Sequence, residues 1–240
     1  MRYLTLLLCL PLFLTCLDDD DLMPAPPPPA PGLPAFSYLA LGDSYTIGTA
    51  VDTARNFPNQ LTDSLKTELD PGADPADVDL KIIAVNGWTT LDLRSGITRR
   101  AAELRDTYDL VTLLIGVNNQ YRGQDFSVYE TQFPQVLNLA IERAGGDPTH
   151  VLVISIPDYS YTPFGSGNRD ITRELARYDA FARATAEARG VRFLDITPIS
   201  QRAEDEPELV ASDNLHPSAE QYRRWIEEVL YEPARAIVVD

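Results

Sequence analysis

Cysteine and histidine are scarce in this sequence. The 240 residues include only two cysteines and two histidines. Both cysteines, Cys9 and Cys16, lie in the first segment, so the rest of the chain offers no disulfide, no thiolate nucleophile and no cysteine ligand for a metal. A zinc site with two imidazole ligands would have to use both His150 and His216. We therefore expect a protein that works without a metal or a cofactor.

Basic residues are also in short supply. Lysine and arginine number 20 against 36 aspartates and glutamates, which gives a formal net charge of −16 at pH 7. Phosphate backbones are bound through Lys and Arg, so this balance argues against a nucleic-acid partner. The length suits one sizeable α/β domain, and the sequence contains no internal repeat. The oligomeric state is left open.

The first 16 residues have the pattern of an export signal. Arg2 precedes an almost wholly apolar run over residues 4–14, which is too short to span a bilayer and matches the core of a signal peptide. Phe13-Leu14-Thr15-Cys16 resembles a bacterial lipoprotein cleavage box. The sequence thus predicts a signal peptide over residues 1–16, with Cys16 as a lipid-bearing N-terminus and the sole attachment to a membrane. Ordinary secretion is the alternative.

Residues 17–34 are predicted to form a tether. Four aspartates at residues 18–21 follow Cys16 and resemble the surface-export signal of Bacteroidetes-type lipoproteins. Residues 24–31 are almost all proline and favour a stiff polyproline II spacer. We expect an exported outer-membrane lipoprotein exposed at the cell surface, or otherwise a secreted or periplasmic protein, with its folded domain over residues 35–240.

Apolar runs alternate with helical periodicity through that domain. Runs of strand character lie at residues 37–41, 79–86, 110–115, 151–156 and 191–196. Helical spacing covers residues 57–69, 89–104, 126–144 and 170–189, and a last helix is predicted over residues 217–230 with Pro217 at its first position. This alternation predicts a three-layer α/β/α sandwich around a mostly parallel five-stranded sheet.

Polar motifs stand just past the predicted strands or just before the last helix. Gly42-Asp43-Ser44, Gly87 and Gly116-Val117-Asn118 follow the first three strands, and Asp213 and His216 precede the last helix. Open α/β folds bind ligands at the carboxyl ends of their strands, so these residues are expected to converge. A serine hydroxyl needs a base to become a nucleophile. A carboxylate three residues before a histidine can hold Nδ1 and leave Nε2 free.

Taken singly, most of these motifs have an ordinary structural explanation, because Gly, Asp, Asn and Ser are frequent in turns. Their order and their common place at strand ends favour an active site. Together they resemble the SGNH subgroup of the GDSL-type hydrolases, over about residues 38–231. In one position this chain departs from that family, which usually has an aspartate where Asn119 stands.

The resemblance implies a flavodoxin-like fold and ester hydrolysis through an acyl-enzyme. Ser44 would be the nucleophile, His216 the general base and acid, and Asp213 the residue that holds the imidazole tautomer. The oxyanion would be bound by the Ser44 N–H, the Gly87 N–H and the Asn118 side-chain amide. Asn119 would have a supporting role.

The expected substrate is a small-molecule or glycan ester. A carbohydrate O-deacetylase or short-chain esterase is the leading case, and a lysophospholipase or other lipid esterase is the alternative. A catalytically idle surface-binding module is a rival, but every triad position is filled, which argues against it.

Two further segments carry separate expectations. The loop over residues 158–169 lies on the active-site side and is either a wall of the substrate pocket or an ordinary long connection. His150 precedes the fourth strand and is expected at the surface, at the edge of the sheet away from the site.

Overall fold

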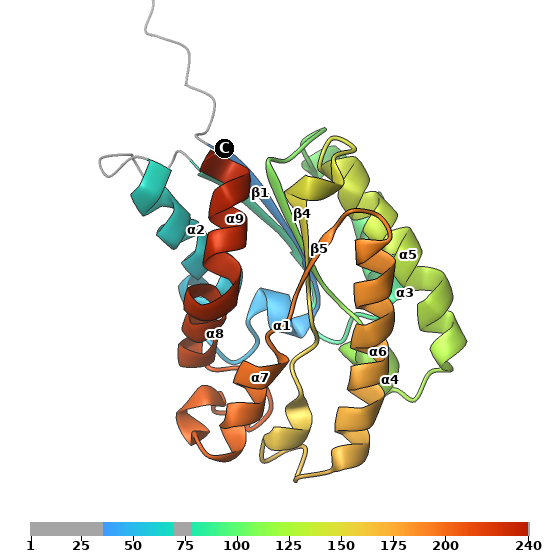
Figure 1. The fold of residues 1–240 in the computed structure, drawn as a ribbon, viewed down its shortest axis with the longest axis vertical. Helices are drawn as coiled ribbons and strands as arrows, with labels where there is room; N and C mark the ends of the chain where they lie inside the picture. Colours follow the sequence, from blue (N-terminus) through green and yellow to red (C-terminus); the bar gives the residue numbers. More distant parts are fainter. Residues whose placement is uncertain (1–35, 70–77, 240) are drawn as a thin grey trace, which may run out of the picture. The chain divides into compact units, whose positions relative to one another are not determined.

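The computed structural model describes residues 36–69 and 78–239 (Figure 1). The predicted signal peptide, cleavage box and tether lie outside the described residues. Within them, no helix has both the length and the apolar character that crossing a membrane requires.

A five-stranded parallel sheet is the centre of the fold. Its strands are β1 (Phe36–Gly42), β2 (Val78–Ala84), β3 (Leu110–Leu114), β4 (Val151–Ile154) and β5 (Arg192–Leu194). They lie in the order β2-β1-β3-β4-β5, and every pair is parallel. This is the flavodoxin-like order, so the predicted fold class is confirmed. β1 and β3 are buried along their whole length, as strands covered on both faces must be.

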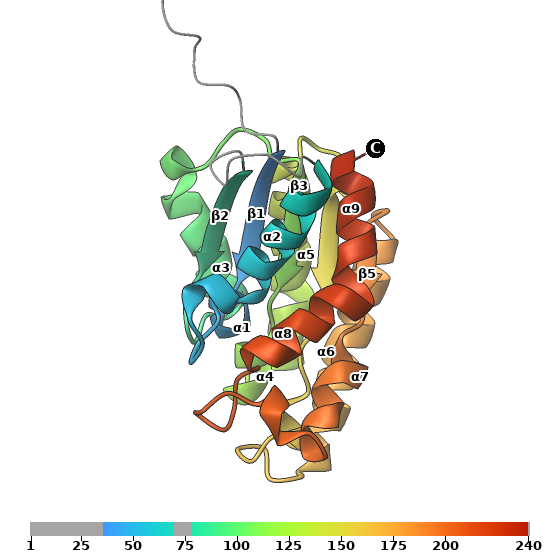
Figure 2. The same cartoon turned by 90° about the vertical axis from the view of Figure 1, so that its left-hand side faces the viewer.

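Two helical layers cover the sheet (Figures 1 and 2). One face carries α2 (Phe57–Leu69), α8 (Ala219–Trp225) and α9 (Tyr231–Val239), and the other carries α3 (Thr90–Arg99), α5 (Phe126–Arg143) and α6 (Arg169–Glu187). Trp225 is fully buried between α2 and α8, with its ring 6.0 Å from Phe57 and 4.9 Å from Tyr222. It therefore belongs to the core, as the sequence indicates for a large apolar residue on a helix.

Short helices and turns fill the connections. They are α1 (Ser44–Ile47), η1 (Thr53–Arg55), η3 (Ala101–Glu103), α4 (Val117–Tyr121), η4 (Pro148–His150), η5 (Tyr159–Tyr161), α7 (Thr197–Ser200), η6 (Gln201–Glu204), η7 (Pro207–Leu209) and the π-helical turn η8 (Ile226–Leu230). Those that follow the carboxyl ends of the strands bring polar residues to one edge of the sheet.

The last helix differs from its prediction. It begins at Ala219 rather than Pro217, because the Ser218 hydroxyl caps it by accepting a hydrogen bond from the Gln221 N–H at 3.2 Å. Pro217 instead forms an isolated antiparallel bridge with Val210. After α8, helical structure continues through η8, which ends at Leu230, and beyond the predicted end through α9.

The predicted helix over residues 89–104 is also shorter in the structure. It ends at Arg99, and a 3₁₀ turn follows. Gly96 lies inside it because the Trp88 ring occupies the space where a side chain would be: a Cβ there would lie 2.3 Å from Trp88 Cη2. The helix-weakening glycine is thus explained by close packing.

Candidate active site

The serine predicted as nucleophile stands on a tight turn after β1. The Asp43 side chain caps α1 by accepting a hydrogen bond from the Tyr45 N–H at 3.1 Å, and Ser44 is the first residue of that helix. The turn leaves no room for a side chain at Gly42, where a Cβ would lie 2.0 Å from Thr46 Oγ1 and 2.5 Å from the Leu114 carbonyl oxygen. The Gly-Asp-Ser motif therefore has a steric and a capping cause in addition to any chemical one.

The Asp43 carboxyl is fully buried beneath this turn. Desolvation raises its pKa to about 7, although hydrogen bonds from the Tyr45 N–H and the Asn118 amide act in the opposite direction. Asp43 lies behind the pocket rather than among its lining residues. Its role is to hold the first turn of α1 and the side chain of Asn118.

The predicted base and its orienting acid form a direct pair. His216 Nδ1 lies 2.5 Å from Asp213 Oδ2, and Asp213 Oδ1 accepts hydrogen bonds from the N–H groups of Leu215 and His216, each at 3.0 Å. Desolvation would raise the pKa of the Asp213 carboxyl, but these hydrogen bonds outweigh it and leave the pKa below its ordinary value. An ionised carboxylate at Nδ1 selects the tautomer that carries its proton there, which leaves Nε2 as the acceptor.

The loop that carries this pair is closed at its base. The Ala211 N–H donates to the His216 carbonyl at 2.8 Å, next to the bridge between Val210 and Pro217. At its tip, Asn214 has a left-handed φ of 64°, which asparagine tolerates better than most residues. The loop is thus held in one conformation from both ends.

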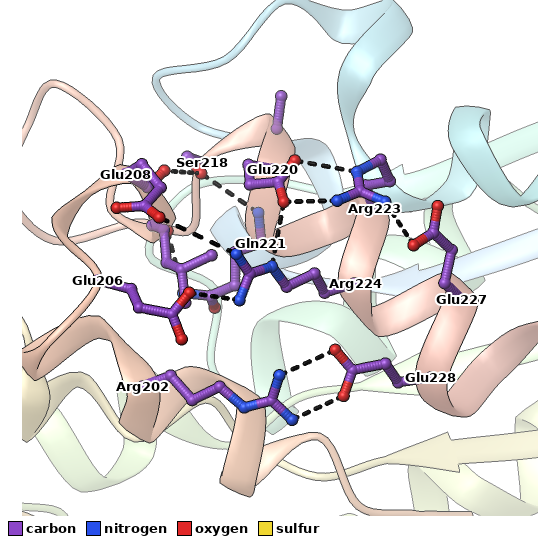
Figure 3. A network of polar contacts seen from close by, with 12 residues as sticks. Arg202, Glu206, Glu208, Ser218, Glu220, Gln221, Arg223, Arg224, Glu227 and Glu228 are labelled. Carbon is purple, nitrogen blue, oxygen red and sulfur yellow. Dashed lines mark hydrogen bonds and ion pairs between the residues drawn. The ribbon is translucent and has the colours of Figure 1, made fainter.

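A network of charged side chains supports the same loop from α8 (Figure 3). Arg224, only 19% exposed, lies 2.5 Å from Glu206 and 3.0 Å from Glu220. The buried Gln221 side chain donates to the Leu209 carbonyl at 3.0 Å. The contacts of Arg224 with Glu206 and of Gln221 with Leu209 join α8 to residues 206–209, which lead directly into the loop that carries Asp213 and His216.

The predicted oxyanion donor Gly87 lies in a turn closed by a hydrogen bond from the Trp88 N–H to the Val85 carbonyl at 3.2 Å. Its φ is +81°, a conformation that glycine adopts without strain. A Cβ on Gly87 would meet only one heavy atom within 4 Å, Arg122 Nη2 at 3.4 Å. Glycine is therefore required here by the backbone conformation rather than by lack of space.

The two adjacent asparagines of α4 have different surroundings. Asn118 lines the pocket, and its Nδ2 donates to the Trp88 carbonyl at 3.0 Å and to Asp43 Oδ2 at 3.4 Å. Asn119 is fully buried and faces the start of α3, where its Oδ1 accepts from the Thr90 N–H at 3.1 Å. Its Nδ2 donates to Thr90 Oγ1 and to Gln124 Oε1, each at 2.9 Å. Asn118 thus lines the pocket and Asn119 does not.

Ser44, Gly87, Asn118 and His216 meet around one pocket of about 290 Å³, and Asp213 lies behind His216. The complete lining also includes residues that the motifs do not mark: Tyr45, Asn86, Val117, Tyr121, Arg122, Tyr159, Phe164 and Leu215. The Tyr45 ring packs edge-on against the His216 imidazole, with their centroids 5.5 Å apart.

The loop over residues 158–169 supplies one wall of this pocket. Tyr159 and Phe164 come from it, and with Tyr121 of α4 they form an aromatic cluster with centroids 6.1 to 6.4 Å apart. The Phe164 N–H donates to the Asn214 carbonyl at 3.0 Å, so the wall is bonded to the tip of the loop that carries Asp213 and His216. Of the two interpretations open from the sequence, the structure supports the pocket wall.

A larger cavity of about 380 Å³ lies at the opposite edge of the sheet, before β4 and β5. It is lined by His150 and Arg192 among others and contains none of the predicted catalytic residues. His150 accordingly lies away from the site. Across residues 36–69 and 78–239, no three His, Cys, Asp or Glu side chains are grouped so that they could hold a metal ion.

Comparison with known proteins gives the family and similar folds. The family model of the GDSL-like lipase/acylhydrolase family matches residues 40–224. The fold is similar to that of TesA (TM-score 0.59, 18% identity, covering 84% of this chain and 97% of TesA). It also resembles the psychrotrophic esterase EstA from Pseudoalteromonas sp. (TM-score 0.62, 15% identity, covering 85% of this chain and 99% of EstA). A third similar fold is that of the acetylxylan esterase Axe2 from Geobacillus stearothermophilus (TM-score 0.57, 17% identity, covering 86% of this chain and 95% of Axe2). A search of curated proteins found no match.

Proposed function

The chain belongs to the GDSL-like lipase/acylhydrolase family and is a carboxylic ester hydrolase, and from this premise we propose that Ser44, His216 and Asp213 are its catalytic triad. The observation that carries the proposal is the Asp213–His216 pair, 2.5 Å apart, on a loop that brings His216 into the same pocket as Ser44. An acid paired with a histidine, in one pocket with a serine, supports a triad in which His216 takes the proton of Ser44.

In the proposed mechanism, Ser44 Oγ attacks the ester carbonyl carbon and its proton passes to His216 Nε2. The carbonyl oxygen becomes an oxyanion, which accepts hydrogen bonds from the N–H groups of Ser44 and Gly87 and from Asn118 Nδ2. The intermediate collapses, the alcohol leaves with the proton from His216, and the acyl group remains on Ser44. Water then attacks the acyl carbonyl carbon while His216 takes its proton. The second intermediate collapses, Ser44 Oγ leaves with the proton from His216, and the acid is released.

The Asn118 amide has a contact that the oxyanion would replace. At 3.4 Å, its hydrogen bond to Asp43 is long, whereas its bond to the Trp88 carbonyl at 3.0 Å is of ordinary length. Because the two amide hydrogens are fixed in one plane, the side chain would rotate slightly as a whole and exchange the long bond to Asp43 for one to the oxyanion. The bond to Trp88 limits that rotation, so the donor needs little reorganisation when the oxyanion forms.

We propose a short acyl group and a sugar alcohol as the substrate, that is, a carbohydrate O-deacetylase or related short-chain esterase. The pocket is small, and its outer wall presents two exposed rings, Tyr121 at 59% and Phe164 at 48% exposure. Exposed apolar surface beside a catalytic site marks a ligand contact. Aromatic rings at the rim suit the apolar face of a sugar, and the acetylxylan esterase among the structural neighbours is consistent with it.

Hydrolysis of a substrate panel tests the choice. We expect acetylated xylo-oligosaccharides and p-nitrophenyl acetate to be cleaved faster than p-nitrophenyl octanoate or lysophosphatidylcholine. Phe164→Ala should raise KM for the oligosaccharides more than for p-nitrophenyl acetate, whereas Leu91→Ala, an exposed apolar residue outside the pocket lining, should change neither. Preference for octanoate or the lysophospholipid would favour the lipid-esterase alternative.

We further propose that the protein is exported and anchored to the outer membrane through a lipid on Cys16, at the cell surface or facing the periplasm. The support is the sequence alone: the apolar leader, the box that ends at Cys16 and the acidic stretch behind it. Cys16→Ala should abolish lipid incorporation into the precursor. Normal maturation of that variant, with release of unmodified protein, would favour simple secretion.

A further inference from the structure

We propose that Arg122 is a positioning residue of the oxyanion hole, which acts by fixing the turn that carries the Gly87 N–H. The proposal rests on the function proposed above, because it gives Gly87 the role of oxyanion donor. Arg122 belongs to none of the recognised motifs. It follows α4 directly and lines the pocket beside Asn118 and Gly87.

Two consecutive carbonyls of the Gly87 turn are held by side chains from α4 and from the residue that follows it. Arg122 Nη2 donates to the Gly87 carbonyl, and Asn118 Nδ2 donates to the Trp88 carbonyl at 3.0 Å. The backbones of the two residues are also joined, since the Arg122 N–H donates to the Asn118 carbonyl at 3.2 Å. One turn of backbone therefore sets the relative placement of both proposed oxyanion donors, the Gly87 N–H and the Asn118 amide.

The turn is closed by the hydrogen bond from the Trp88 N–H to the Val85 carbonyl and is held by Asn118 at the Trp88 carbonyl, and Arg122 adds the contact at Gly87 itself. Val85 and Asn86 are exposed to solvent, and Gly87 has no side chain with which to pack. Glycine reaches positive and negative φ almost equally well, so the direction of its neighbouring peptide groups depends on contacts from outside. A guanidinium is planar and holds its hydrogen-bond acceptor in a defined direction. Arg122 supplies that constraint.

The other contacts of Arg122 are weaker. Its nearest carboxylate, Asp92, is 3.9 Å away, and both side chains are largely exposed. The Asp92 carboxylate is also engaged by the N–H and the hydroxyl of Thr89, at 3.0 and 2.8 Å. An exposed pair of this kind contributes little to stability. The Gly87 carbonyl is thus the main partner of the guanidinium, and removal of Arg122 should leave the fold intact.

Steady-state kinetics of Arg122→Ala and Arg122→Gln on p-nitrophenyl acetate, a neutral substrate, test the proposal. Complete loss of an oxyanion donor costs about 10²–10³ in rate, so a misaligned one should lower kcat by about ten- to a hundredfold. KM should stay within about twofold, because the contact strengthens mainly in the transition state. Arg122→Lys should recover part of the loss. Arg94→Ala removes an arginine that contacts Gln135 outside the pocket and should leave kcat unchanged.

Binding of an arylboronic acid, whose tetrahedral adduct with a serine places an oxygen in the oxyanion hole, gives a second readout. The affinity of the boronic acid for the Arg122 variants should fall by the same factor as their kcat/KM. The urea midpoints of these variants should match that of the wild type. Unchanged kcat in both the alanine and glutamine variants would overturn the proposal. So would a defect confined to KM, which would make Arg122 a substrate-binding residue. Full turnover by Ser44→Ala would instead refute the triad, and that result is independent of the Arg122 comparison.

Discussion

Replacing Asn118 and Asn119 one at a time distinguishes a residue that acts in catalysis from a residue that stabilises the fold. Asn118→Ala removes an amide that lines the pocket, and we expect kcat to fall by about 10²–10³, equivalent to about 2.7–4 kcal/mol of transition-state stabilisation. KM should change less, since an oxyanion exists only after attack has begun. Asn118 is half-buried, so the loss of its bonds to Trp88 and Asp43 should cost less stability than the loss of the fully buried Asn119 amide.

Asn119→Ala should act through stability instead. It leaves the Thr90 N–H, buried at the start of α3, without its acceptor, and an orphaned buried donor costs about 1–3 kcal/mol. Asn119→Asp keeps an acceptor for that N–H. It loses the bonds donated to Gln124 Oε1 and Thr90 Oγ1, but the Gln124 amide and the Thr90 hydroxyl can turn and donate instead. The aspartate variant should therefore be more stable than the alanine variant.

The assay is kcat, KM and the urea midpoint for the three variants beside the wild type. A large kcat defect in Asn119→Ala with a mild one in Asn118→Ala would show that the assignment of the two asparagines is reversed. Near-normal kcat in both alanine variants would mean that the oxyanion is bound by other groups, and the reasoning from the pocket geometry would fail.

Two further predictions follow from buried groups near the site. The pKa of Asp43, raised by burial to about 7, lies above the value of about 3.9 for an unfolded chain, so between these pH values the folded protein holds a proton that the unfolded chain has lost. The contribution of Asp43 to the free energy of unfolding therefore falls as pH rises from about 4 to 7, by at most about 4 kcal/mol. Asp43→Asn should flatten that part of the plot of unfolding free energy against pH, and an unchanged slope would contradict the burial argument. Gly96→Ala should destabilise by about 1–3 kcal/mol despite alanine's better helix propensity, because its Cβ would overlap the Trp88 ring. Ser95→Ala, on the exposed side of the same helix, should change the urea midpoint little, and a stabilised Gly96→Ala would show that Trp88 moves freely.

The sheet and the convergence of the motifs could be predicted from the sequence because both depend on local signals. Buried parallel strands are continuous apolar runs, and each ends at a glycine or a polar residue, as β1 does at Gly42 and β3 before Gly116. The pairing of Asp213 with His216 depends on residues three apart in one loop, so spacing alone indicated it.

Features that depend on distant contacts were not predictable. The start of α8 depends on the Ser218 cap and on the bridge between Pro217 and Val210, and nothing local shows that residue 210 lies beside residue 217. The short helices and turns over residues 197–209 have too few residues for a period to emerge. Arg122 and Tyr121 stand one turn beyond Asn118, which is the one local signal that could have drawn attention to them.

Covalent labelling of the intact protein with a fluorophosphonate, followed by peptide mapping, tests the central claim most directly. We expect a single adduct on Ser44, with loss of esterase activity in proportion to labelling, and neither labelling nor turnover in a folded Ser44→Ala variant. An adduct on another residue that abolishes activity, or turnover by Ser44→Ala at the wild-type rate, would contradict the assignment of Ser44 as the nucleophile.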